Sequence, residues 1–147
     1  MYNYWWFGDE RKEKGRCECQ TFNDQSVEGD WSIWDGMSFH LFHLKIEKSG
    51  QFGVYVSDTE RNTMSNCQVS HSKYSGVEVD YGLIIINGSG TSIHNNVTGG
   101  YSGNYGLHTS SSSFIHLVSP LTKESVSINN GGGGNHGGTG TIKTIKK

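Results

Sequence analysis

The sequence predicts an all-β protein whose chain winds into stacked coils of short parallel strands. Three observations favour this fold class: the composition, the kind of apolar residue and a repeated strand motif. Glycine contributes 21 and serine 19 of the 147 residues, and alanine is absent. Valine and isoleucine together number 19, against six leucines. Because β-branched residues favour strands and the best helix former is missing, a helical bundle is excluded.

A short motif, glycine-apolar-x-apolar, supplies the repeat. Its three copies are Gly53–Val56, Gly76–Val79 and Gly106–Thr109, which are spaced by 23 and then 30 residues. Glycine before a strand suits a corner at which backbones approach closely. A unit this short cannot bury its apolar face alone, so we expect the copies to stack in register.

Alternation along each strand predicts which side chains stack. The expected inward columns are Leu44/Cys67/Val97, Val54/Val77/Leu107 and Val56/Val79/Thr109. Seven extra residues between the second and third copies are placed within Leu83–Thr91, as a loop or a small extra strand. Downstream, Ser125–Ile128 is similar to the motif, with serine in place of glycine. The alternative fold is an antiparallel sandwich or barrel, which would have hairpin turns in place of these columns.

The rhythm of residues 66–82 (NCQVSHSKYSGVEVDYG) and 95–109 (NNVTGGYSGNYGLHT) resembles the repeats of pectate-lyase-like proteins. Asn66 and Asn96 each precede the first strand of a copy, as the stacked turn asparagines of that family do. The resemblance covers about residues 37–110. It implies a right-handed, single-stranded parallel β-helix. The family includes lyases, hydrolases, epimerases, viral tailspikes and adhesins, so the fold alone does not fix an activity.

The chain divides into three predicted parts. Residues 1–36 carry all four tryptophans and are expected to form an aromatic-rich N-terminal cap or a partial coil. Residues 37–130 hold the β-helix repeats. Residues 131–147 are predicted to be a glycine-rich linker and a basic C-terminal tail, whose alternating end could instead add an edge strand. Since three clear coils make a small core, we expect a homotrimer or a part of a longer chain.

The predicted register also stacks polar side chains on an outer face. Tyr55, Glu78 and His108 share one outward column, and Asp80 lies two residues beyond Glu78. Two carboxylates and a histidine can exchange protons with a sugar, so Glu78, Asp80 and His108 are the candidate catalytic residues. The alternative is an ordinary solvated sheet face with a cross-strand charge contact.

Candidate substrate-binding residues surround that column. Tyr74 and Tyr105 lie in the turns before the second and third glycine motifs, where they could stack on sugar rings or pack over the turn. Tyr55 is the third aromatic candidate. Arg61 is included because the resemblance suggests an arginine base beside acidic calcium ligands, which makes Ca²⁺ the one cofactor considered. No metal-ligand residues are assigned, and the catalytic motifs of polygalacturonases and mannuronan epimerases are absent or broken.

Bulk properties exclude several partners. The formal net charge is −2, which gives no electrostatic footprint for nucleic acid. The sequence has no apolar run that predicts a membrane span, and residues 1–14 show no signal peptide. Three cysteines disfavour a disulfide framework. Two functions remain: a β-helix that binds or processes a polysaccharide outside the cell or on a cell or virion surface, and a non-catalytic structural β-helix of a viral fibre, tailspike or adhesin.

Overall fold

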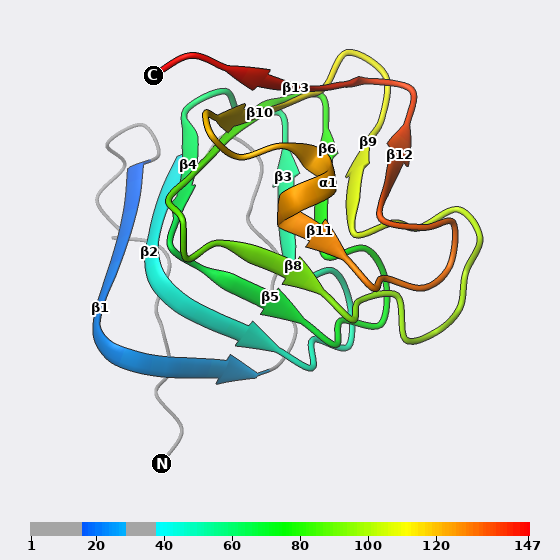
Figure 1. Ribbon diagram of the computed structural model, residues 1–147, viewed down its shortest axis with the longest axis horizontal. Coiled ribbons are helices and arrows are strands. Elements are labelled where there is room, and N and C mark those ends of the chain that lie inside the picture. The colour runs from blue at the N-terminus through cyan, green and yellow to red at the C-terminus, as the bar shows by residue number, and fades with distance from the viewer. Residues whose placement is uncertain (1–15, 29–37) are drawn as a thin grey trace.

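The computed structural model describes residues 16–28 and 38–147 and shows a β-solenoid. Strands β1 to β13 and a four-residue helix, α1 (Lys123–Val126), make up the regular structure of these residues (Figure 1). Every strand pairing among them is parallel. The fold class predicted from the repeat is therefore confirmed, and the antiparallel alternative is excluded.

Each coil contributes strands to three faces, which we call the first, second and third face. The first face contains the start of β2 (Ser38–Glu47), β4 (Asn62–Ser65), β7 (Leu83–Asn87), β10 (Phe114–Val118) and β13 (Thr141–Ile145). The second face contains the end of β2, β5 (Gln68–Ser70), β8 (Ser92–His94) and β11 (Ser127–Ile128). The third face is a four-stranded sheet of β3 (Val54–Ser57), β6 (Val77–Asp80), β9 (Leu107–Thr109) and β12 (His136–Gly138).

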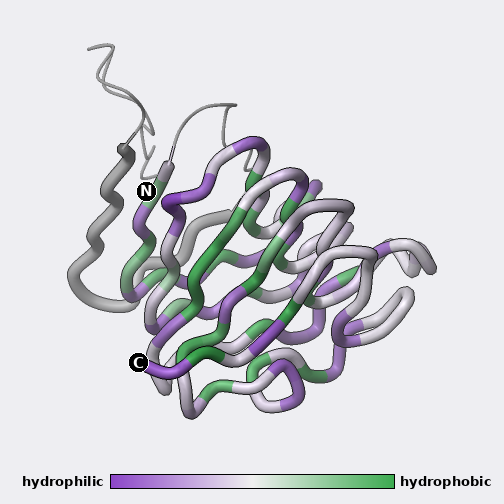
Figure 2. The backbone as a smooth tube through the Cα atoms, turned by 90° about the horizontal axis from the view of Figure 1, so that it is seen from above, coloured by the Kyte–Doolittle hydropathy of each residue, from purple (hydrophilic) through white to green (hydrophobic). Residues whose placement is uncertain are grey.

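The first two faces form one continuous nine-stranded sheet because β2 runs through the corner between them. At that corner His43 has a φ of 54°, in the left-handed region. Strand β1 (Arg16–Glu28) pairs with both halves of β2, with an irregularity between Gln20 and Gln25. The rest of the predicted N-terminal cap, including its four tryptophans, lies outside the described residues. Figure 2 shows the successive turns lying side by side, with longer loops projecting at one side.

Two of the three predicted core columns are confirmed residue by residue. Val54, Val77 and Leu107 pair in register, and so do Val56, Val79 and Thr109, all at most 1% exposed. These β-branched and leucine side chains fill the interior between the three faces. Period-2 alternation thus buries one side of each short strand and leaves the other for solvent.

The first predicted column is wrong in its third member. The register of β2 with β5 aligns Leu44 with Cys67, and that of β5 with β8 brings Thr91 to this position. Val97 lies instead in a turn, with a φ of 60°. The extra residues of the third copy consequently lie between β8 and β9, at residues 95–106. The predicted insertion at Leu83–Thr91 is wrong, since β7 is a regular strand of the first face.

The corner after the second face is a ladder of polar residues. Lys48, His71, Asn95 and Asn129 all adopt left-handed backbone conformations there, with φ between 54° and 57°. The residue that follows each of these positions turns its side chain inward. In one coil this residue is Asn96, whose side chain forms hydrogen bonds with the coils on both sides. Its Oδ1 accepts hydrogen bonds from Ser72 N and Oγ at 3.1 and 2.8 Å, and its Nδ2 donates to Asn130 Oδ1 at 3.0 Å. Asn96 therefore stacks with Ser72 and Asn130 and not, as predicted, with Asn66.

The C-terminal segment differs from the predicted linker at its glycines, whereas its alternating end forms an edge strand, which was the alternative considered for it. Strand β12 pairs with β9, and β13 pairs with β10, so residues 136–145 complete one coil and begin the next. The glycines pair through their backbone, and at Gly137 a Cβ would lie 2.4 Å from the Tyr105 ring. Glycine is thus needed for stacking here, where composition alone suggested flexibility. The Ser125–Ile128 segment is also not a glycine strand, because it forms α1 and β11.

Candidate functional site

The predicted polar column lies on the outer side of the third face. Strand register aligns Tyr55 with Glu78 and Glu78 with His108, and Gly137 follows in β12. Asp80 lies at the end of β6, beside Ser57 of β3. Three short strands of the rigid solenoid therefore hold these side chains at one coil spacing, which is about 4.8 Å.

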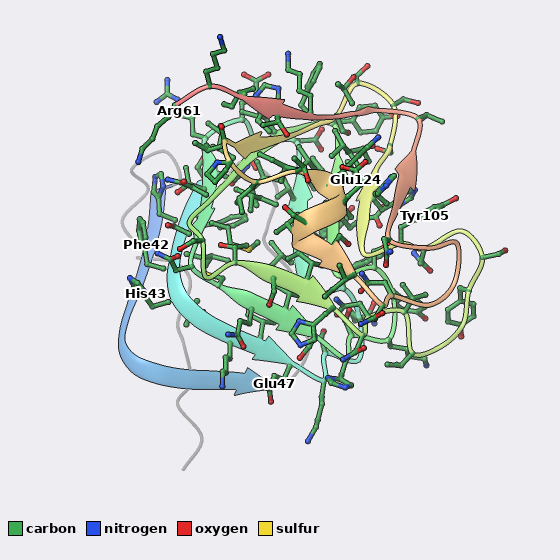
Figure 3. All side chains as sticks on the ribbon, in the orientation of Figure 1. Phe42, His43, Glu47, Arg61, Tyr105 and Glu124 are labelled. Atoms are coloured by element: carbon green, nitrogen blue, oxygen red, sulfur yellow. The ribbon has the colours of Figure 1, made fainter. Side chains whose placement is uncertain are left out.

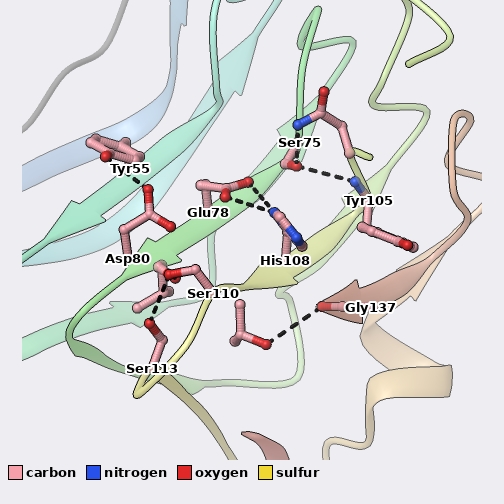
Figure 4. A network of polar contacts seen from close by, with 12 residues as sticks. Tyr55, Ser75, Glu78, Asp80, Tyr105, His108, Ser110, Ser113 and Gly137 are labelled. Carbon is pink, nitrogen blue, oxygen red and sulfur yellow. Dashed lines mark hydrogen bonds and ion pairs between the residues drawn. The ribbon is translucent and has the colours of Figure 1, made fainter. Parts of the chain in front are cut away.

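Glu78 and His108 form a close pair in this column (Figure 4). The Nδ1 atom of His108 lies 2.6 and 2.7 Å from the two carboxylate oxygens of Glu78. The hydrogen bond to Glu78 raises the pKa of His108, and this effect exceeds the opposing effect of burial. Glu78 is only 5% exposed, so water competes little for its oxygens. Within the described residues the Nε2 atom of His108 makes no hydrogen bond, and this nitrogen can exchange a proton with a ligand.

Asp80 has a different partner. The Tyr55 hydroxyl donates a hydrogen bond of 2.9 Å to Asp80 Oδ2. Burial, followed by this hydrogen bond, raises the pKa of Tyr55 to about 12. The two carboxylates therefore do not form a mutual pair, because one is held by a histidine and the other by a tyrosine. The sequence predicted that these residues come together, and the structure adds which side chain contacts which.

A run of aromatic rings borders the same face. The ring centroids of Tyr55 and Phe52 are 5.2 Å apart, those of Phe52 and Tyr74 are 5.5 Å apart, and those of Tyr74 and Tyr101 are 5.2 Å apart. Sequence reasoning did not assign Phe52 to the site. Its position directly before Gly53, equivalent to that of Tyr105 before Gly106, was the available signal.

Tyr105 covers the other side of the Glu78–His108 pair. Its ring stacks on the imidazole of His108 with the centroids 5.2 Å apart, and its backbone N–H donates to Ser75 Oγ at 3.1 Å. Figure 3 shows Tyr105 at the side of the molecule formed by the third face. Of the aromatic side chains on this face, Tyr101 is 46% exposed and the other four are half-buried: Phe52, Tyr55, Tyr74 and Tyr105.

Arg61 does not join this group. It is exposed and lies in the corner just before β4, a strand of the first face. Figure 3 places it on the opposite side of the molecule from Tyr105. Among the residues that the structure describes, no group of three or more histidine, cysteine, aspartate or glutamate side chains is arranged to hold a metal ion. The geometry of this part of the chain therefore offers no cluster of ligands for the calcium ion that was considered.

No protein-family model matches the chain, and no curated protein or solved structure matches it either. The likeness to pectate-lyase-like repeats consequently remains a prediction from the sequence, while the parallel solenoid itself is observed. In the described part of the chain, no helix has the length and apolar character needed to cross a membrane.

Proposed function

We propose that the outer side of the third face binds a polysaccharide. The observation that carries this proposal is the run of aromatic rings, Tyr55, Phe52, Tyr74 and Tyr101, beside the Glu78–His108 pair and its covering Tyr105. Aromatic rings offer flat apolar surfaces at low entropic cost, and a few fixed polar groups beside them give orientation and specificity. An extended sugar chain, with apolar ring faces and hydroxyl edges, has matching chemistry.

The same geometry supports proton transfer to or from a bound sugar. Glu78 fixes the ring of His108 through Nδ1, so that Nε2 is the nitrogen left for a ligand. A histidine oriented in this way can act as a general acid or base near neutral pH. We assign His108 the proton-transfer role and Glu78 the positioning role. Asp80, engaged with the Tyr55 hydroxyl, is assigned to sugar hydroxyl contacts.

Binding of the full chain to a panel of neutral and acidic polysaccharides tests this proposal by affinity electrophoresis. Removing a stacking ring by Tyr74→Ala or Tyr105→Ala should weaken binding about tenfold, since aromatic contacts contribute about 1 kcal/mol or more. Ile128→Ala is the control, because Ile128 is an exposed apolar side chain on the second face. An equal loss of affinity in the Ile128→Ala control, or no binding of the wild type to any polysaccharide, would contradict the proposal.

Product analysis on the polysaccharide that binds best tests the processing role. Any cleavage should fall at least about tenfold in Glu78→Gln and in His108→Gln, because each removes one half of the oriented pair. Unchanged rates in both variants would remove the catalytic assignment while leaving the binding proposal in place.

A structural role is the second candidate function, and one observation favours it. Glu78 pairs with His108 Nδ1 and Asp80 pairs with the Tyr55 hydroxyl, and Glu78 is only 5% exposed. Such pairs also suit a stiff solenoid of a viral fibre, tailspike or adhesin. If this is the role, Glu78→Gln lowers the thermal midpoint and Tyr74→Ala changes no ligand affinity.

A further inference from the structure

A pocket of about 430 Å³ lies at the corner between the third and first faces, away from the aromatic run. Its lining includes Tyr81, Phe114, Leu83, His116, Lys143 and Glu60. Tyr81 is 61% and Phe114 is 40% exposed, and they are two of the four large apolar side chains that are exposed in the described residues. Two exposed aromatic rings at one pocket indicate a surface for a flat, apolar ligand.

The strands of the first face hold much of this pocket in place. Strand register aligns Phe114 with Leu83 and His116 with Lys143, so these four side chains form two neighbouring outward columns. The rings of Phe114 and His116 meet edge to face with their centroids 5.9 Å apart. A site built on paired strands needs little ordering when a ligand binds.

Charge is distributed unevenly along the pocket. Lys143 is the one cationic lysine or arginine of the lining, and it extends from β13. Glu60 precedes β4, which is three strands away in the first face, or about 14 Å at ordinary strand spacing. Burial lowers the pKa of His116, and the nearby charge of Lys143 lowers it further. Its Nε2 atom is buried and has no hydrogen-bond partner among the described residues.

We propose that this pocket binds a small ring compound that carries a carboxylate. The ring lies against Tyr81, Phe114 and Leu83, and the carboxylate pairs with Lys143. This proposal concerns a different surface from the third face and does not depend on polysaccharide binding there.

Nuclear magnetic resonance titration of the full chain tests the proposal with three probes. These are 4-hydroxybenzoate, its neutral analogue 4-hydroxybenzamide, and glucuronate. We expect saturable shifts in the Phe114 and His116 signals with at least one acid and weaker binding of the amide. Tighter binding of 4-hydroxybenzoate would identify an aromatic acid as the ligand type, and tighter binding of glucuronate would identify a sugar acid.

Variants locate the carboxylate and the ring. Lys143→Gln should raise the Kd of the bound acid about threefold, which is the size expected of an exposed ion pair. Lys146→Gln is the matched control, since Lys146 is exposed and does not line the pocket. Tyr81→Ala, at a corner outside the strands, should weaken both acid and amide. Linear shifts without saturation, equal affinity for acid and amide, or an unchanged Kd in Lys143→Gln would overturn the proposal.

Discussion

His108 connects the ionisation of one side chain to the stability of the fold. Its pKa in the folded protein is raised above the ordinary value of 6.5, chiefly by the hydrogen bond to Glu78. A raised pKa means that the folded state holds the proton more tightly than the unfolded state. The stabilisation is therefore complete below pH 6.5 and is lost as the pH rises through the folded value.

We predict that the free energy of unfolding falls more between about pH 6 and about pH 9 in the wild type than in His108→Gln. Urea denaturation at both pH values measures the difference, and the start at pH 6 keeps carboxylates ionised. His71→Asn is the control, because His71 is an exposed corner residue whose φ of 57° asparagine tolerates. An identical pH dependence in the wild type and His108→Gln would show that the Glu78–His108 pair does not contribute to the free energy of unfolding.

For single residues of the candidate site, the sequence predicted which side chains lie in one column better than it predicted which of them contact each other. Alternation along β6 and β9 was enough to place Glu78 and His108 in one outward column, because neighbouring coils repeat the same register. It could not predict that Asp80 bonds to Tyr55, since that choice depends on side-chain rotamers. Arg61 was assigned through a family resemblance, and the corner before β4 carries it away from the column.

Among the elements, the glycine corners before the third face leave little room for a side chain. A Cβ added at Gly76 would lie 2.6 Å from Ile93 Cγ2 and 2.7 Å from the Gly106 carbonyl oxygen. Because the second of these atoms belongs to the backbone of the next coil, the two coils would have to move apart. The glycine of the repeated motif is thus required by the close approach of stacked coils.

Gly76→Ala should therefore lower the free energy of unfolding by about 2 kcal/mol, the usual cost of overpacking a rigid site. Gly103→Ala is the matched control, since a Cβ there meets nothing within 4 Å. Urea unfolding of both variants measures the effect. A loss of the same size at both positions would mean that backbone freedom, and not coil packing, explains the glycine.

The extra residues predicted at Leu83–Thr91 lie instead between β8 and β9, and this error shows that a repeat motif does not fix where an insertion falls. Val97 lies nine residues before Gly106, as Cys67 lies nine before Gly76, and both are buried. Thr91 and Ile93, however, fit the same inward alternation and are the residues that stack. Both alignments satisfy the pattern, and only the backbone path decides between them. The C-terminal glycines were misjudged for a related reason, because β12 pairs through backbone groups that composition does not report.

For the whole molecule, the described core is one hydrophobic cluster that runs through the stacked coils from Phe39 to Val126. Val77 is fully buried and pairs with Val54 on one side and Leu107 on the other. We predict that Val77→Asp prevents folding, because an unpaired buried charge costs more than about 4 kcal/mol. Circular dichroism should show loss of β structure in Val77→Asp and none in Gln68→Asp, where the side chain is exposed on β5. A folded Val77→Asp protein would contradict the described register.

The long corner between β8 and β9 has a use beyond the native chain. It takes up several residues more than the equivalent corner between β5 and β6, yet the strands on both sides keep their pairing. Around Gly103 there is open space on the side where a Cβ would project. A foreign peptide grafted at this glycine would be displayed on the surface, with the solenoid serving as its scaffold.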